Sequence, residues 1–179
     1  MLTNKNSALV VIDFQGNLAQ AMDNKQDLFN NAEKIIRGAQ ALGIPVLATE
    51  QIPAKLGATI PEIARHLTGV KIIAKEDFSC WQNESFKREL TALDRKQILI
   101  IGIEAHICVY QTAMALVDAG YEVQVVADAI SSRTPQNRIT GIQKMAAGSV
   151  GITSTEMALF ELLKTAADPR AKQIFQIVK

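Results

Sequence analysis

The sequence predicts an α/β fold in which a six-stranded, mostly parallel sheet carries helices on both faces. The first observation is a series of short β-branched apolar runs, which are typical of strands buried on both faces. The second is that helical stretches lie between these runs, and such alternation indicates a parallel sheet with right-handed crossovers. The predicted strands are 8–12, 45–48, 70–74, 97–101, 121–126 and 150–153.

Apolar stripes at helical spacing predict the helices between these strands. The clearest stripe runs from Leu28 to Leu42 and ends at Gly43 and Pro45, residues that are typical of a helix C-terminus. The layers are therefore helices, sheet and helices, a three-layer sandwich. The other stripes lie within 86–93, 109–117, 139–145 and 157–163.

Start signals agree with two of these helices. Thr134 and Pro135 predict an N-cap followed by a proline in the first turn. The stretch from Thr153 to Glu156 has the form of a capping box. The segment 51–69 contains no clear strand, so we expect a loop with a short helix there. Substrate-binding residues are often carried by such loops.

Length and composition predict one domain, 1–179, that handles a small molecule. The chain is long enough for one full core, and its 19 basic and 18 acidic residues give a net charge of only +1. That balance provides no electrostatic footprint for nucleic acid or for an anionic membrane. The two cysteines, Cys80 and Cys108, form neither a disulfide framework nor a CxxC pair, and the short N-terminal apolar run is no signal peptide. We therefore expect a cytoplasmic protein.

Three chemically useful side chains follow predicted strands at the points where the strands end. Asp13 follows the first strand, Lys75 follows the third, and Cys108 lies just after the fourth, where a helix begins. In open parallel sheets, ligands bind outside the carboxyl ends of the strands. We therefore expect these three side chains to converge on one pocket.

These residue types are suited to nucleophilic catalysis. At a helix N-terminus the positive end of the helix dipole favours a thiolate, so we expect a lowered pKa for Cys108. A carboxylate such as Asp13 can accept the thiol proton, and an ammonium group such as Lys75 can hold that carboxylate ionised. Taken singly, each residue is also compatible with a structural role, as a core cysteine, a turn former or a solvated lysine.

Three stretches of the chain resemble the isochorismatase-like cysteine hydrolase superfamily in order, spacing and identity. They are 8–15, 73–79 and 101–113, and the last of these, with Gly-Ile-Glu-Ala-His-Ile-Cys at 102–108, is the most specific. Two further stretches, 126–133 and 152–156, extend the similarity over nearly the whole chain. The form of the third stretch looks closest to the isochorismatase-domain-containing branch, whose physiological substrates are largely unassigned.

The resemblance implies a six-stranded parallel sheet and a catalytic triad of Asp13, Lys75 and Cys108. It also implies a cis peptide bond between Ile103 and Glu104, with the backbone N–H groups of Glu104 and Cys108 forming an oxyanion hole. A homo-oligomer, a dimer or larger, is implied as well.

The sequence departs from the nicotinamidases of this superfamily, which bind a divalent metal through an Asp and several His residues. The corresponding stretch, 48–57, contains no His and no Asp, and the whole chain has only His66 and His106. We therefore expect no metal, and Glu50 alone provides at most a weak cation contact. No organic cofactor is expected either, because the chain has neither a GxGxxG nor a P-loop motif.

Five further residues are candidates for contact with substrate, and each has a structural alternative. Gln15 either orients the site or satisfies loop backbone, and His106 either lines the pocket or caps a backbone group. The aromatic residues Phe14, Phe78 and Trp81 either wall an apolar pocket or belong to the core. Cys80, which follows Phe78-Ser79 and precedes Trp81, is expected to be a packing residue.

The preferred hypothesis is a cysteine-dependent hydrolase that cleaves an amide, ureide or ester of a small molecule, with a C–N bond favoured, through a thioester. Isochorismatases proper cleave a vinyl ether and depend more on the acid, so the presence of Cys108 favours acyl chemistry. Two alternatives belong to other classes: a non-catalytic interaction protein on the same scaffold, and a redox sensor using Cys108. The intact set of Asp13, Lys75 and Cys108 argues against the first, and the lack of an obvious resolving cysteine against the second.

Overall fold

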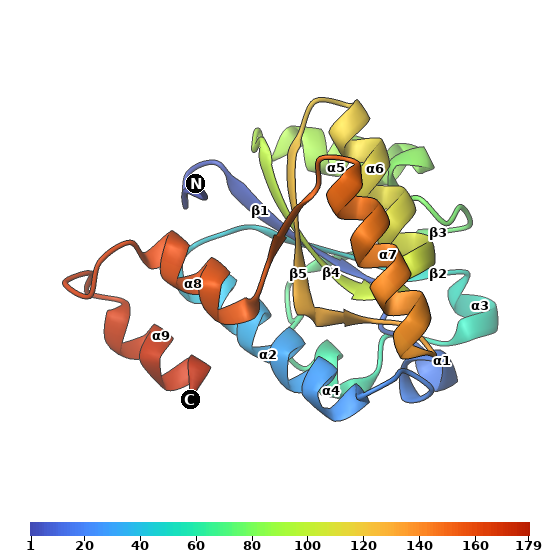
Figure 1. Cartoon of the computed structure of the whole chain (residues 1–179), viewed down its shortest axis with the longest axis horizontal. Helices are drawn as coiled ribbons and strands as arrows, with labels where there is room; N and C mark the ends of the chain where they lie inside the picture. Colours follow the sequence, from blue (N-terminus) through green and yellow to red (C-terminus); the bar gives the residue numbers. More distant parts are fainter.

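The computed structural model describes residues 1–179 and contains one six-stranded sheet in which every strand pairing is parallel. The strand order is β3-β2-β1-β4-β5-β6, so the chain starts in the middle of the sheet and winds outward to both edges (Figure 1). This confirms the predicted fold class. The strands are β1 (Ser7–Ile12), β2 (Val46–Gln51), β3 (Lys71–Lys75), β4 (Gln97–Ile103), β5 (Glu122–Ser131) and β6 (Gly151–Thr153).

Helices cover both faces of this sheet, and each face has its own hydrophobic core. One core packs against α2 (Lys25–Ala41), α4 (Pro61–Ala64), α8 (Thr155–Leu163) and α9 (Ala171–Val178). The other packs against α5 (Glu84–Ala92), α6 (Tyr110–Asp118) and α7 (Pro135–Ala147). Shorter elements connect the strands: α1 (Gly16–Gln20), α3 (Pro53–Leu56), the 3-10 turn Cys80–Gln82 and the π-helical turn Ala105–Val109.

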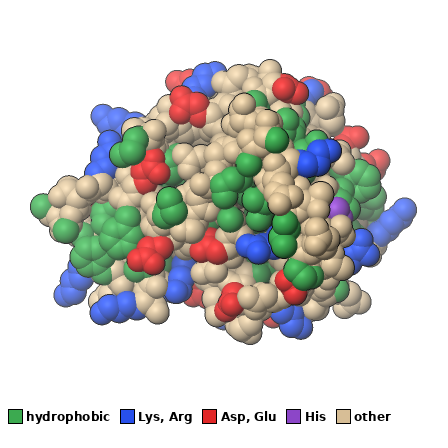
Figure 2. All heavy atoms as spheres, in the orientation of Figure 1, with side chains coloured by type: hydrophobic (Ala, Val, Ile, Leu, Met, Phe, Trp, Pro, Cys, Tyr) green, Lys and Arg blue, Asp and Glu red, His purple; other side chains and the backbone are tan.

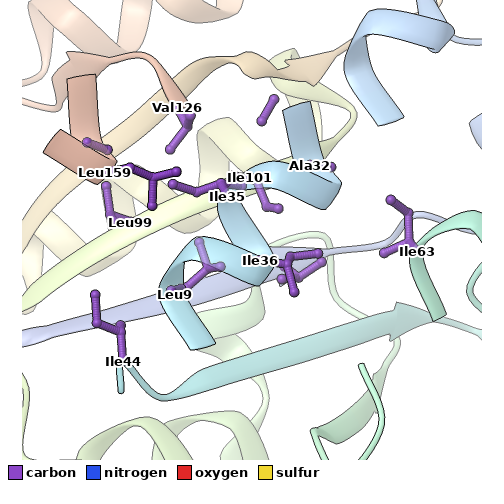
Figure 3. Close-up of a cluster of buried hydrophobic side chains, with 14 of the residues drawn as sticks. Leu9, Ala32, Ile35, Ile36, Ile44, Ile63, Leu99, Ile101, Val126 and Leu159 are labelled. Carbon is purple, nitrogen blue, oxygen red and sulfur yellow. The ribbon is translucent and has the colours of Figure 1, made fainter. Parts of the chain in front are cut away.

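The two central strands are buried along their whole length, which explains their unbroken apolar sequence. In Figure 3, Leu9 of β1 and Leu99 and Ile101 of β4 meet Ile35 and Ile36 of α2. Full burial of each such side chain contributes about 1.5–3 kcal/mol. This packing fixes the carboxyl ends of β1 and β4, where two of the three predicted site residues lie.

The main deviations from the predicted elements lie at strand and helix ends. β2 continues past the predicted strand 45–48 to Gln51, and β5 continues past 121–126 to Ser131. Thr134 is the N-cap of α7, as predicted, whereas α8 is capped by Ser154 instead of Thr153. The helices α1 and α9 are absent from the predicted set. None of the helices is both long and apolar enough to cross a bilayer.

Candidate active site

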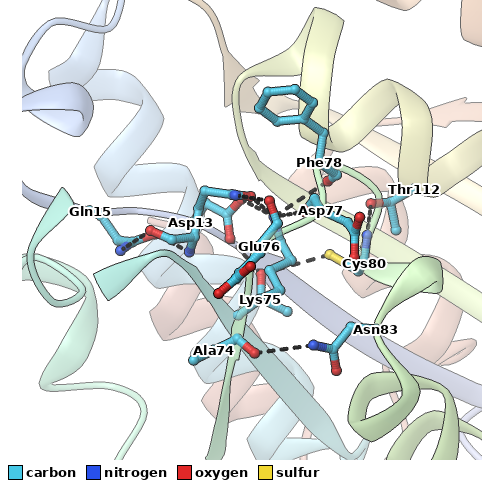
Figure 4. A network of polar contacts seen from close by, with 12 residues as sticks. Asp13, Gln15, Ala74, Lys75, Glu76, Asp77, Phe78, Cys80, Asn83 and Thr112 are labelled. Atoms are coloured by element: carbon cyan, nitrogen blue, oxygen red, sulfur yellow. Dashed lines mark hydrogen bonds and ion pairs between the residues drawn. The ribbon is translucent and has the colours of Figure 1, made fainter. Parts of the chain in front are cut away.

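The three predicted site residues come together at the carboxyl edge of the sheet. Asp13 directly follows β1, Lys75 is the last residue of β3, and Cys108 lies in the π-helical turn after β4. The Lys75 ammonium group contacts the Asp13 carboxylate, with 2.7 Å between Nζ and Oδ2. Both side chains are almost completely buried, and both belong to the polar network drawn in Figure 4. The predicted convergence of Asp13 and Lys75 is therefore present in the fold.

Lys75 has an acceptor set that fits a charged ammonium group. Besides Asp13, Nζ donates to the side-chain oxygen of Gln51 at 2.6 Å and to the main-chain oxygens of Asp77 and Phe78 at 3.2 and 3.3 Å. Burial by itself would lower the pKa of Lys75, but Asp13 and the two cysteines together outweigh burial and raise it. Lys75 is therefore a fixed positive charge at neutral pH, held beside Asp13.

The Cys108 thiol is only 8% exposed, and its acidity differs from the sequence-based expectation. Burial raises the pKa of Cys108 to about 12, and the charge of Asp13 acts in the same direction, whereas Lys75 opposes the increase. The predicted decrease is wrong, because burial disfavours the thiolate more strongly than the nearby positive charge favours it. In the resting protein Cys108 is therefore a neutral thiol beside a carboxylate.

Cys80 is completely buried and belongs to the hydrophobic core on the α5–α7 face, as its predicted packing role requires. Its main-chain N–H donates to the hydroxyl of Thr112 at 2.9 Å. Burial raises the pKa of the Cys80 thiol to about 11, although Lys75 opposes the increase. Both cysteines are free thiols. Cys108 is therefore the more accessible of the two thiols to reagents, but neither thiol is activated by a lowered pKa.

The raised thiol pKa values predict that stability falls as the pH rises above about 9. Between the ordinary value of 9.0 and about 11, the folded protein keeps the Cys80 proton that the unfolded chain releases. The folded state then binds more protons than the unfolded state, so the free energy of unfolding decreases with pH. Urea titrations at several pH values should show a shallower decrease for Cys80→Ala than for the wild type. Equal slopes would contradict the prediction.

Two of the residues predicted to contact substrate instead have partners within the fold. Gln15 is completely buried, donates to the main-chain oxygens of Gln51 and Gly57, and accepts from the Gln51 N–H at 2.6 Å. It therefore joins the loop after β1 to the end of β2. Phe14 is also buried, with its ring edge-on to Phe29 of α2 and 6.4 Å between the centroids. The structure thus places Phe14 in the core rather than among the site residues.

The remaining aromatic candidates lie on the outer side of the site. Phe78 follows Lys75 closely, and its side chain is 55% exposed while its main-chain oxygen accepts from Nζ. Trp81 is half-buried and stacks edge-on against Tyr121, 5.5 Å between centroids. Phe78 is therefore free to contact a ligand, whereas Trp81 has a partner within the fold.

The segment before Cys108 is held by polar contacts with the end of β5 and the loop after it. The peptide bond between Ile103 and Glu104 is cis, at the position that the resemblance implies. The buried Glu104 carboxylate pairs with the Arg133 guanidinium, with 3.0 Å between Oε1 and Nε. His106 Nδ1 lies 2.9 Å from the Ser132 hydroxyl, so its ring has a protein partner.

Two functional neighbours were missed by reasoning from the sequence, and both lie on β2. The Thr49 hydroxyl donates to Asp13 Oδ1 at 2.7 Å, and Gln51 accepts from Lys75. In a strand that continues to residue 51, the side chains of residues 49 and 51 lie on the same face. The predicted strand stopped at residue 48, so Gln51 was expected in a loop, and Thr49 was expected just past the strand end without a role in the site.

The residues at the end of β2 do not fit the metal centre that some members of the superfamily carry. No group of three or more His, Cys, Asp or Glu side chains lies close enough together to hold a metal ion. Glu50, the one carboxylate in the corresponding stretch, accepts from the N–H and the hydroxyl of Thr59 at 2.7 and 2.8 Å. Its role is therefore to fix the loop after α3.

The comparisons with known proteins all point to the same protein family. The isochorismatase domain model matches residues 7–157. The secreted isochorismatase effector Isc1 of Phytophthora sojae is 34% identical over 177 residues, covering 97% of this chain and 84% of that protein. Isochorismatase domain-containing protein 2 of Danio rerio is 33% identical over 178 residues, covering 99% and 89%.

A solved structure of the MAR1 ribonuclease from Caenorhabditis elegans superimposes with a TM-score of 0.93 at 30% identity, covering 99% of this chain and 91% of that one. The family match therefore extends from sequence to fold, and hydrolytic chemistry is the activity class that such relatives support. The chain belongs to the isochorismatase domain family.

Proposed function

We propose that this protein is a cysteine-dependent hydrolase that cleaves an amide, ureide or ester bond of a small molecule, with Cys108 as the nucleophile. The observation that carries the proposal is the buried ion pair of Asp13 and Lys75, with 2.7 Å between Oδ2 and Nζ, whose two charges both act on the Cys108 thiol. A core cysteine has no need of such a pair. Nucleophile, base and electrostatic partner are thereby available in one place.

The raised pKa of Cys108 determines the order of the first step. Because the resting thiol is neutral, Asp13 accepts its proton as the sulfur attacks the carbonyl carbon. The C–S bond forms, the carbonyl π electrons move to oxygen, and the tetrahedral intermediate expels amine or alcohol, which takes the proton from Asp13. A water molecule then gives its proton to Asp13 and attacks the thioester, releasing acid and restoring the thiol.

The oxyanion of both tetrahedral intermediates requires hydrogen-bond donors. We propose the backbone N–H groups of Glu104 and Cys108 for this role, which is supported by their place in the segment that leads into the π-helical turn. The Glu104–Arg133 pair holds this segment against the loop after β5. Preorganised donors of this kind contribute about 2.7–4 kcal/mol to transition-state stabilisation in hydrolases.

Burial and charge favour a small, uncharged substrate over a nucleic acid. The name of the Caenorhabditis elegans relative indicates ribonuclease activity for that protein. This chain, however, has a net charge of only +1, whereas binding to a phosphate backbone depends on an excess of Lys and Arg. The almost complete burial of Asp13, Lys75 and Cys108 also favours small acyl groups. Phe78 is the aromatic side chain that we propose for contact with the substrate.

The experiment that tests this proposal is a panel of small amides, ureides and esters, with p-nitrophenyl acetate as a chromogenic ester and RNA as a separate arm. We expect hydrolysis of at least one acyl substrate and, in rapidly quenched samples, an acetylated Cys108 peptide. Cleavage of RNA alone, or reaction without any modification of Cys108, would reject the proposal. Disulfide formation in place of turnover would favour the redox alternative.

Removal of metal ions is expected to leave the activity unchanged, because no step requires a metal. Incubation with EDTA followed by gel filtration, with metal content measured in parallel, checks this prediction. The control is the same protein carried through the procedure without EDTA. Stoichiometric zinc or iron that is lost together with the activity would contradict it.

We further propose a homo-oligomer that works in the cytoplasm. Hydrophobic side chains gather over α8 and α9 in Figure 2, on the left of that view. Two exposed rings of these helices, Phe160 and Phe175, stack with 5.7 Å between their centroids, and such a patch favours contact between subunits. The two free thiols support a reducing compartment. Light scattering and cell fractionation test these two proposals.

A further inference from the structure

We propose that Thr49 is a positioning residue for the reaction, because its hydroxyl fixes the orientation of the Asp13 carboxylate toward Cys108. This inference rests on the proposed function, in which Asp13 moves the proton. Thr49 does not touch the reacting atoms in this assignment. It acts through Asp13, and its effect should therefore appear in the chemical step rather than in binding.

Thr49 and Asp13 are joined twice. The Asp13 N–H donates to the main-chain oxygen of Thr49 at 3.2 Å, and the Thr49 hydroxyl donates to Asp13 Oδ1 at 2.7 Å. Thr49 is 1% exposed, so bulk water cannot replace its hydroxyl without a rearrangement of the strand end. A hydrogen bond to a charged group is stronger than one between neutral groups, so it can select one carboxylate orientation.

The direction of the Thr49 hydroxyl is also determined by the structure. The Cys80 sulfur lies 3.8 Å from Thr49 Oγ1 and is placed to donate its proton to that oxygen. The hydroxyl proton of Thr49 is then directed at Asp13. Burial supports this arrangement, since it keeps the Cys80 thiol protonated. A hydrogen-bond chain thus leads from Cys80 through Thr49 to Asp13.

The carboxylate is consequently held at both oxygens. Oδ1 accepts from Thr49 and Oδ2 accepts from Lys75, so rotation about the terminal torsion would break one of the two bonds. An ionised carboxylate has about four acceptor positions, which leaves capacity for the Cys108 proton. Gln51 restrains Lys75 in turn, so β2 carries a restraint for each member of the ion pair.

The test compares Thr49→Val, which removes the hydroxyl at nearly constant volume, with Thr49→Ser, which keeps it. Thr153→Val is the matched control, because Thr153 is also buried in a strand but has no bond to the three site residues. With p-nitrophenyl acetate we expect Thr49→Val to lower kcat about tenfold or more while KM changes less than about twofold. Thr49→Ser and Thr153→Val should stay within about threefold of the wild type.

A second readout does not depend on turnover. The rate at which iodoacetamide alkylates Cys108, measured by peptide mapping between about pH 7 and pH 9, reports the thiolate fraction. Without the Thr49 donor the Asp13 charge is less compensated, so Cys108 in Thr49→Val should react about threefold more slowly, as half a pKa unit requires. Thermal denaturation of all variants establishes that they are folded.

The two readouts separate failure of this inference from failure of the proposed function. If Cys108→Ala hydrolyses the ester as fast as the wild type, the proposed function fails, and the alkylation rates still decide whether Thr49 acts on Cys108. Wild-type alkylation rates in Thr49→Val would overturn the inference. So would equal losses of kcat in Thr49→Val and Thr49→Ser, which would indicate that packing alone is responsible.

Discussion

Replacement of Cys108 with alanine is expected to abolish hydrolysis, lowering kcat at least about a thousandfold, with the fold intact. Loss of a catalytic nucleophile removes the covalent route, and only binding and oxyanion stabilisation remain. The side chain is 8% exposed at the margin of a core, so the deletion of one sulfur creates little cavity. Steady-state kinetics with p-nitrophenyl acetate and circular dichroism measure the two parts of this expectation.

Cys80→Ala is the matched control, because it removes the same atom from the other cysteine, which is fully buried. We expect that variant to lose less than about tenfold in kcat, since Cys80 acts only through Thr49. It should also be the less stable of the two, because a cavity in a packed core costs free energy. A Cys108→Ala protein with near-normal hydrolysis would reject covalent catalysis, and a greater loss in Cys80→Ala would move the nucleophile.

Local sequence signals were sufficient for the fold and for the place of the three main residues. The apolar runs have the composition of strands buried on both faces, and β1 and β4 are indeed buried at every position. Asp13, Lys75 and Cys108 could be placed together because parallel strands all end at one edge of the sheet. This inference needs only the positions of the strand ends, which the sequence indicates by a polar residue after each apolar run.

What could not be predicted depends on packing between distant segments. The predicted second strand ended before Thr49 because polar residues end the apolar run, although pairing of β2 with β1 and β3 extends the strand over them. The acidity of Cys108 follows from burial by neighbouring segments, and no local motif reports burial. The sequence left Phe14 open between a pocket wall and the core, because its partner in the core, Phe29, lies on a helix that begins eleven residues after it.

Removal of Lys75 alone is expected to destabilise the protein strongly as well as to inactivate it. In Lys75→Met the Asp13 carboxylate stays buried without its counter-ion, and a buried charge left without a partner costs about 3–5 kcal/mol. The Gln51 side chain and the two main-chain oxygens also lose their donor. Urea denaturation should therefore show a lower free energy of unfolding, and alkylation of Cys108 should slow because Lys75 no longer favours the thiolate.

The double variant Asp13→Asn/Lys75→Met distinguishes a lost charge pair from lost packing. It removes both charges at nearly constant volume, and replacing a buried ion pair with neutral groups is often close to neutral for stability. We therefore expect it to recover at least half of the stability that Lys75→Met loses, while hydrolysis remains abolished because no base is left. If the loss of unfolding free energy in the double variant equalled the sum of the losses in the two single variants, the two charges would not be coupled. Recovered activity would remove Asp13 from the mechanism, since no neutral amide can accept the thiol proton.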